Sequence, residues 1–192
     1  FNFKDIDLVN KWVLPIKVAP DPSGSYAVNP YKNYAKALLR VFPYNNYSGD
    51  YSATTLTIAN AGDPANAIGM EYARAYVVDE NTVFFYAGNV DETYTERAKY
   101  KIYARFNGGT QGTVTFWSDN PQLKFTTDNK ASFRIDEMMD EVKPYLKHRY
   151  IIVNNVNYNY VDYTSVPNYE MEYTVKGTLT LERKINTQIK NP

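Results

Sequence analysis

The stretch YEMEYTVKGTLTLE, residues 169–182, alternates apolar and polar positions without an exception. Tyr, Met, Tyr, Val, Gly, Leu and Leu stand at the odd positions, and Glu, Glu, Thr, Lys, Thr, Thr and Glu at the even ones. Because successive side chains of a strand point to opposite faces, this pattern predicts one half-buried strand of about 14 residues. Gly177 interrupts the apolar face and marks where such a strand could bend around a barrel.

The run VNNVNYNY, residues 153–160, lies just upstream and predicts the partner strand. In it Val156, Tyr158 and Tyr160 alternate with Asn155, Asn157 and Asn159, and TSVPN (residues 164–168) between the two runs has the composition of a loop. The tyrosines on the apolar face of this hairpin are predicted to fill a β core rather than to form a binding surface. They are Tyr158, Tyr160, Tyr169 and Tyr173. Tyr163 does not fit this register.

Upstream segments predict further hairpins. KYKIYARF (residues 99–106) alternates in the same way, and the turn NGG leads from it into GTVTFWS (residues 112–118). One segment has a helical period instead, formed by Ile135, Met138, Met139, Val142 and Leu146. It predicts one short helix, although Pro144 counts against an unbroken one. Successive hairpins with a single helix predict an all-β fold, with an antiparallel sheet closed into a barrel or folded into a sandwich. The long last strand favours the barrel.

The composition excludes several classes of function. The 192 residues carry 21 Lys and Arg against 21 Asp and Glu, so no net charge draws the chain to nucleic acid or to an anionic membrane. No apolar run approaches the ~20 residues that a transmembrane helix needs. The chain contains no cysteine, which removes disulfides and thiolate chemistry. It begins at Phe1 rather than at methionine, which indicates a processed or truncated piece.

Candidate catalytic and metal-binding residues are few. Glu170 and Glu172 are predicted on one strand face roughly 7 Å apart, a separation at which two carboxylates could act as acid and base of a glycosidase. The threonines and the lysine on that face are more typical of a solvated sheet surface. His148 is the only histidine, so a multi-histidine metal site is impossible. Asp and Asn oxygens at residues 119–120 and 128–129 leave a calcium site open, but without EF-hand spacing. No metal site and no cofactor is predicted.

Aromatic side chains are the remaining candidates for a binding site. Sugars place their C–H faces on flat rings, while amides and carboxylates bond their hydroxyl groups. The loop PYNNYSGDY (residues 43–51) offers both kinds of group, and Trp117, Tyr103 and Tyr86 are each predicted on the strand face opposite the core. Such outward rings could equally form a second core beneath a covering helix. The ligand-binding residues predicted on this basis are Trp117, Tyr44, Asn46 and Tyr47.

Three stretches together resemble a family of Bacteroidetes domains of unknown function. VFPYNNYSGDYSAT (residues 41–54) resembles the opening of that domain, and YVDYTSVPNYEMEYTVKGTLTLERKINTQI (residues 160–189) resembles its closing strands. KWVLPIKVAP (residues 11–20) resembles the last strand of the adhesin-like immunoglobulin-type domain that usually precedes it. The resemblance implies that residues 1–33 are the last strand of that upstream domain plus a linker. Residues 34–192 are then an antiparallel, lipocalin-like (calycin-type) β-barrel, to which the helical period adds one short helix.

The same resemblance implies a surface lipoprotein encoded near outer-membrane glycan-uptake systems, located on the cell surface or on the periplasmic side of the outer membrane. Its expected partners are an oligosaccharide and other outer-membrane glycan-uptake proteins, and no nucleic acid is expected. The resemblance carries over no catalytic residue. The first hypothesis is therefore a non-enzymatic domain that binds or presents glycans. A structural spacer or protein-docking module is the alternative, and a glycoside hydrolase is the third.

Overall fold

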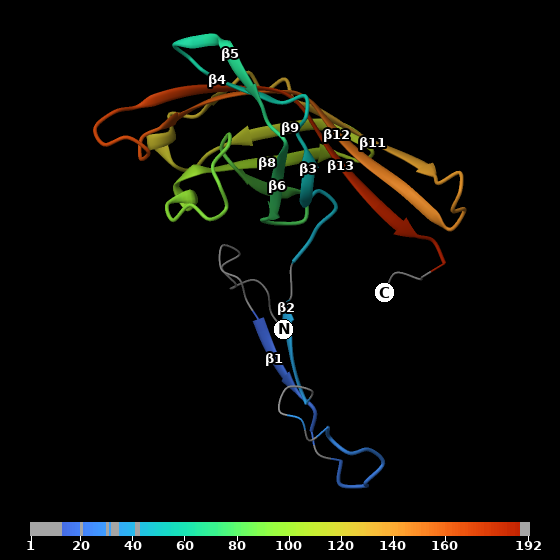
Figure 1. Ribbon diagram of the computed structural model, residues 1–192. Helices are drawn as coiled ribbons and strands as arrows, with labels where there is room; N and C mark the ends of the chain where they lie inside the picture. Colours follow the sequence, from blue (N-terminus) through green and yellow to red (C-terminus); the bar gives the residue numbers. More distant parts are fainter. Residues whose placement is uncertain (1–12, 20, 30, 32–34, 41–42, 189–192) are drawn as a thin grey trace. The chain divides into compact units, whose positions relative to one another are not determined.

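The computed structural model describes residues 13–19, 21–29, 31, 35–40 and 43–188, and the chain divides into two compact units between Pro43 and Tyr44. In the first unit, β1 (Val13–Lys17) pairs antiparallel with β2 (Lys36–Arg40), as Figure 1 shows. The predicted boundary at residue 34 thus lies inside this unit. That the first unit ends an immunoglobulin-type domain stays a prediction.

The second unit is built from antiparallel strands. They are β3 (Gly49–Ser52), β4 (Thr57–Asn60), β5 (Asp63–Gly69), β6 (Tyr72–Val77), β7 (Thr82–Tyr86), β8 (Lys101–Gly108), β9 (Gln111–Trp117), β10 (Thr126–Thr127), β11 (Ser132–Met139), β12 (Leu146–Asp162) and β13 (Met171–Asn186), with the 3-10 helices η1 (Arg97–Tyr100) and η2 (Pro121–Leu123). Eight of the strands form a ring in the order β12, β11, β9, β8, β7, β6, β3 and β13, and the pairing of β13 with β12 closes it (Figure 1). A β4–β5 hairpin extends from β13, and β10 pairs with β12. The predicted all-β barrel is confirmed.

The long last strand is the one that the alternation predicted. Before Gly177, β13 pairs with β4 as well as with β12, and after Gly177 its second neighbour is β3. Gly177 has a φ of +145°, and a Cβ added there would lie 2.2 Å from the carbonyl oxygen of Thr55. Only glycine fits this crossing point. The break in the apolar pattern therefore marks where the strand changes neighbours.

Side chains fill the interior of the barrel. Its aromatic members are Tyr47, Tyr51, Phe85, Tyr100, Phe106, Phe116, Phe133, Tyr158 and Tyr160. Aliphatic residues from β3 to β13 complete the same cluster, among them Ile102, Val114, Ile151 and Leu181. An interior packed in this way is a core rather than a ligand chamber. The outer face and the ends of the barrel are therefore the places to look for a ligand site.

The tyrosines of the last hairpin follow the predicted register with one exception. Tyr158 and Tyr160 are core residues, 7% and 3% exposed, and Tyr173 packs against the core. Tyr169 is 61% exposed because β13 begins two residues later, so its predicted core position is wrong. Tyr163, which did not fit the register, also packs against the core.

The helix predicted from the apolar period at residues 135–146 is wrong. Residues 132–139 form β11, which pairs with β12 at all eight of its positions. Ile135 packs against the core, whereas Met138 and Val142 are 56% and 86% exposed. The apolar residues that mimic a helical period thus lie on β11, at the start of β12 and in the exposed turn between these strands. The described residues contain two 3-10 helices and no α-helix.

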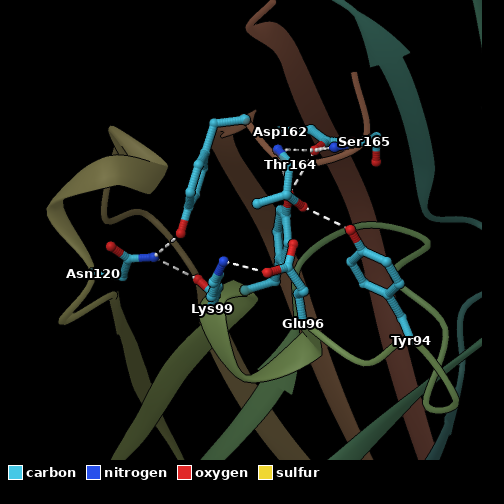
Figure 2. Close-up of polar contacts among 9 residues, drawn as sticks. Tyr94, Glu96, Lys99, Asn120, Asp162, Thr164 and Ser165 are labelled. Carbon is cyan, nitrogen blue, oxygen red and sulfur yellow. Dashed lines mark hydrogen bonds and ion pairs between the residues drawn. The ribbon is translucent and has the colours of Figure 1, made fainter. Parts of the chain in front are cut away.

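A network of polar side chains closes one end of the barrel, where the connections after β7, β9 and β12 meet (Figure 2). The Tyr100 hydroxyl donates to Asp162 Oδ1 at 2.5 Å, and the hydroxyls of Tyr94 and Tyr100 lie 2.8 and 2.6 Å from Thr164 Oγ1. Burial by itself would raise the pKa of Asp162, but hydrogen bonds from Ser165 and Tyr100 outweigh burial and hold this pKa below its ordinary value. These hydroxyl groups bond to other protein groups, which fits a role in sealing this end.

Candidate binding surface

Trp117 lies on the outer face of the barrel, opposite in direction to the core residues of β9. It stands directly across from Tyr103 on β8, and the two rings stack with centroids 5.2 Å apart. The indole Nε1–H donates to Asp119 Oδ1 at 3.1 Å, and the Arg105 guanidinium lies 5.7 Å from the ring centroid. These partners leave Trp117 half-buried.

The same register continues as a row of rings across four strands. Tyr76, Phe84, Tyr103 and Trp117 stand opposite one another on β6, β7, β8 and β9, with successive centroids 4.9, 6.3 and 5.2 Å apart. We call this row the aromatic ladder. Phe84 is 3% exposed although it points away from the core cluster, and the Lys101 ammonium lies 4.7 Å from its ring centroid. Cross-strand aromatic pairs stabilise a sheet, and rings packed in this way leave little free face for a ligand.

The other three predicted residues share one loop but have different environments. Tyr47 is 5% exposed and stacks on Phe106 inside the barrel at 4.0 Å, and burial raises the pKa of its hydroxyl. Tyr44 is 78% exposed, with the Arg183 guanidinium 5.7 Å from its ring centroid. Asn46 is exposed in a turn. A ligand could therefore reach Tyr44 and Asn46, but Tyr47 belongs to the core and does not join them.

A cleft of about 450 Å³ opens on the outside of the barrel beside β3 and β6. Its lining residues are Asp50, Tyr72, Arg74, Asp91, Glu92 and Thr93. Asp50 of β3 stands opposite Arg74 of β6, and Tyr72 lies two residues away on the same face of β6. The other three lining residues come from the loop after β7. We call this hollow, made by three segments distant in sequence, the β3–β6 cleft.

Arg74 is the organising cation of the β3–β6 cleft. Its Nε lies 3.5 Å from Asp50 Oδ1 and 3.8 Å from Glu92 Oε1. Its guanidinium also lies 5.6 Å from the ring centroid of Tyr76, the first ring of the aromatic ladder. Burial raises the pKa of Tyr76, and its hydrogen bond to Glu92 raises this pKa further. The cleft and the aromatic ladder thus meet at Arg74 and Tyr76.

The remaining lining residues supply an exposed ring and a fixed carboxylate. Tyr72 is 61% exposed. Asp91 Oδ1 accepts hydrogen bonds from the hydroxyl and the backbone N–H of Thr93, each at 2.6 Å, and these two bonds lower the pKa of Asp91. The carboxylate is therefore ionised at neutral pH and held in place. A ring, three carboxylates and a guanidinium in one hollow can stack on a polyhydroxylated ligand and hydrogen-bond to it.

The carboxylates that the sequence offered for glycoside cleavage lie elsewhere. Glu170 precedes β13 and pairs with Lys124 Nζ at 2.5 Å, while Glu172 is exposed on β13 itself. Neither residue lines the β3–β6 cleft. Within the described parts of the chain, no three His, Cys, Asp or Glu side chains are arranged to hold a metal ion.

The sequence contains a partial signal for the β3–β6 cleft, which lies on a strand rather than in the aromatic loop of residues 43–51. In YARAYV, residues 72–77, Tyr72, Arg74 and Tyr76 alternate with two alanines and a valine, which turns the larger side chains outward. The loop residues 91–93 carry no such signal. Their approach to β6 follows from the closure of the barrel rather than from any local pattern.

A family model whose description reads "-like, C-terminal" matches residues 35–180, and among curated proteins none matches. An auxiliary nutrient binding protein from Bacteroides thetaiotaomicron has a similar solved structure: it is 49% identical with a TM-score of 0.85, over 98% of this chain and 62% of its own. A protein of unknown function from Bacteroides ovatus is 37% identical with a TM-score of 0.85, and the match covers 100% of this chain and 63% of that protein's chain. A multidomain protein including DUF1735, also from Bacteroides ovatus, is 35% identical with a TM-score of 0.84, and the match covers 100% of this chain and 64% of that protein's chain.

The chain therefore spans less than two thirds of the length of each of these relatives. They are described as a binding protein, a multidomain protein and a protein of unknown function. In the described part of the chain, no helix has the length and apolar character of a membrane span. Because the family model covers well over half of the chain, the protein belongs to this family of "-like" C-terminal domains, with solved relatives in Bacteroides.

Proposed function

We propose that this domain is a non-enzymatic module that binds an oligosaccharide nutrient in the β3–β6 cleft. One observation carries the proposal: the cleft joins the exposed ring of Tyr72 to carboxylates and a guanidinium. Ligand sites are typically concave and combine aromatic surface with a few convergent polar groups. The 49% identical relative from Bacteroides thetaiotaomicron, described as an auxiliary nutrient binding protein, supports a binding role.

The binding mechanism follows from the chemistry of the lining residues. Tyr72 offers a ring face on which the C–H groups of a pyranose can stack. Asp50 and Glu92 accept hydrogen bonds from sugar hydroxyls, and Arg74 donates to hydroxyl or ring oxygens. Arg74 already lies within 3.8 Å of both carboxylates, so these side chains lose little conformational freedom when the ligand arrives.

The test is a glycan-array screen of the purified chain, followed by calorimetric titration of each hit. We expect saturable binding that Tyr72→Ala weakens at least about tenfold, the size of effect that losing one central aromatic contact produces. Tyr169→Ala is the matched control, because Tyr169 is also 61% exposed but lies outside the cleft. The control variant should bind like the wild type.

Trp117→Ala separates this proposal from the one that the sequence suggested. If the aromatic ladder acts mainly on stability, Trp117→Ala leaves the affinity within about threefold, whereas a primary stacking role would make it the most damaging substitution. Tyr44→Ala tests the exposed loop in the same way. Absence of binding across a broad panel of neutral and acidic glycans would contradict the proposed function.

The cellular location belongs to the same proposal. Uptake of an oligosaccharide nutrient places the domain at the cell surface or on the periplasmic side of the outer membrane, within a lipoprotein that works beside other glycan-uptake proteins. Protease accessibility of the protein on intact cells would test this placement. Cleavage in intact cells would support the surface position, cleavage once the outer membrane is permeabilised would support the periplasmic side, and cleavage only after full lysis would contradict both.

A docking role is the second candidate, and the tip of the β11–β12 hairpin favours it. Several apolar side chains at this tip are exposed to solvent: Met138 is 56% exposed, Met139 47%, Val142 86% and Tyr145 38%. Exposed apolar groups of this kind often mark contacts with another protein surface. Hydrogen exchange in the longer Bacteroides thetaiotaomicron relative, compared with its excised barrel, would show whether the corresponding hairpin is covered.

A further inference from the structure

We infer that the β3–β6 cleft selects uncharged oligosaccharides against acidic ones, an inference that rests on the proposed function. Three of the six lining residues are carboxylates, and a single one is a guanidinium. The lining therefore carries a formal charge of −2 when all four groups are ionised. A uronate or a sulfated sugar would bring a further negative charge into the same hollow.

The cation of the cleft is already committed to the protein. Arg74 lies 3.5 Å from Asp50 and 3.8 Å from Glu92, and its guanidinium packs over the Tyr76 ring. An anionic sugar could recruit Arg74 only by drawing it away from these two carboxylates. They would then face the ligand without their positive partner, and like charges in proximity are unfavourable.

The hydrogen-bonding character of the lining points the same way. Ionised carboxylates only accept hydrogen bonds, and they bind best to groups that donate. The hydroxyl groups of an uncharged sugar supply such donors. Asp91 strengthens this preference, because its bonds from Thr93 keep it ionised and fix it at the rim of the cleft.

Two cations outside the cleft, Lys101 and Arg105, pack against rings of the aromatic ladder instead. Lys101 lies over Phe84, and Arg105 lies over Trp117 and 3.8 Å from Asp79. Both stand on β8, which is separated from β6 by β7. Neither lines the β3–β6 cleft, so they do not offset its negative charge at the ligand position.

The experiment measures dissociation constants by calorimetry for oligosaccharides of equal length that differ in charge. The probes are neutral gluco-, manno-, galacto- and xylo-oligosaccharides, oligogalacturonates with their methyl esters, and sulfated galacto-oligosaccharides. We expect every ligand whose binding is lost in Tyr72→Ala to be uncharged, and each acidic probe to bind at least about tenfold more weakly than its uncharged counterpart. Binding of the uncharged ligands should change little between low and high salt.

Asp91→Asn supplies the charge control, since it removes one negative charge and keeps the shape of the side chain. We expect it to narrow the ratio between the dissociation constants of acidic and uncharged ligands, because both classes lose one carboxylate acceptor while only the acidic ligands also lose a repulsive charge. An acidic oligosaccharide that binds as tightly as its uncharged counterpart, and loses this binding in Tyr72→Ala, would overturn the inference while leaving the proposed function standing. If no probe of either class binds, the proposed function itself fails.

Discussion

At the scale of single residues, His148 is the one histidine of the sequence, and it lies between two carboxylates. Its Nδ1 lies 2.6 Å from Glu182 Oε1 and its Nε2 3.0 Å from Asp140 Oδ2, so both ring nitrogens face carboxylates. The hydrogen bond to Asp140 and then that to Glu182 raise the pKa of His148 above its ordinary value of 6.5. Asp140 also accepts the backbone N–H groups of Val142 and Lys143, so the imidazolium ties the β11–β12 turn to β13.

The sign of the pH dependence follows directly. Because the pKa of His148 is raised in the folded state, its protonation stabilises the fold. This stabilisation is fully present at a pH below the unfolded pKa of about 6.5, and it is lost as the pH rises through the folded pKa. The hydrogen bond from His148 and the backbone N–H bonds from Lys143 and Val142 together lower the pKa of Asp140 to about 2, so the stabilising contribution of this carboxylate is lost only in acid, between about 4 and 2. The protection factors for hydrogen exchange at residues 140–148, in which the intrinsic pH dependence of exchange is divided out, should fall above neutral pH, and His148→Gln should remove this alkaline step. An unchanged profile in the variant would contradict the role of His148.

Gly177 gives a second residue-scale prediction. We expect Gly177→Ala to lower the free energy of unfolding by about 2–4 kcal/mol, because its Cβ would lie 2.2 Å from the Thr55 carbonyl oxygen and φ is +145°. Gly69→Ala is the control, since a Cβ there meets no atom within 4 Å. It should change the stability by less than about 0.5 kcal/mol in urea unfolding. Equal effects of the two substitutions would show that the strand crossing can relax.

At the scale of elements, the aromatic ladder should stabilise the sheet by packing across β6, β7, β8 and β9. Phe84→Ala is expected to cost about 3 kcal/mol of unfolding free energy, the range for a buried phenylalanine, although Phe84 points away from the core cluster. Tyr169→Ala, at a 61% exposed position, should cost less than about 0.5 kcal/mol. Urea unfolding of both variants checks the difference. A Phe84→Ala variant as stable as the control would mean that the ladder contributes no packing.

Elements with a strict period of two were predictable, and the others depended on their neighbours. The alternation of residues 171–182 is local and therefore sufficient to find β13. The second half of β11, residues 135–139, was predicted as helix because Ile135, Met138, Met139 and Val142 copy a helical spacing. Its true conformation is decided by eight paired positions on β12, a strand of 17 residues. Local periodicity cannot show such a partner.

At the scale of the whole molecule, closure of the ring creates the candidate site. The alternation of side chains along each strand is enough to predict that Trp117 and Tyr72 point outward. The prediction was made for Trp117 only. The β3–β6 cleft also requires β3 beside β6, with the loop of residues 91–93 folded against them. The ion pairs of Arg74 with Asp50 and Glu92 join residues 24 and 18 positions apart in sequence, so they follow from topology. The burial of Tyr47 has the same origin, because its turn-like sequence does not reveal that the ring enters the barrel.

The closure of the eight-stranded ring by the pairing of β13 with β12 also predicts how the chain responds to truncation. The core cluster is drawn from residues between Tyr47 and Leu181, and all eight strands of the ring lie after Pro43. We therefore expect a chain that starts at Tyr44 to unfold in one transition, with a Tm within about 3 °C of that of the barrel in the whole chain and unchanged oligosaccharide affinity. Deleting residues 178–192 instead removes the part of β13 that pairs with β3 and opens the ring. Calorimetry should then show no cooperative transition, and a cooperative one would mean that the barrel does not depend on closure through β13.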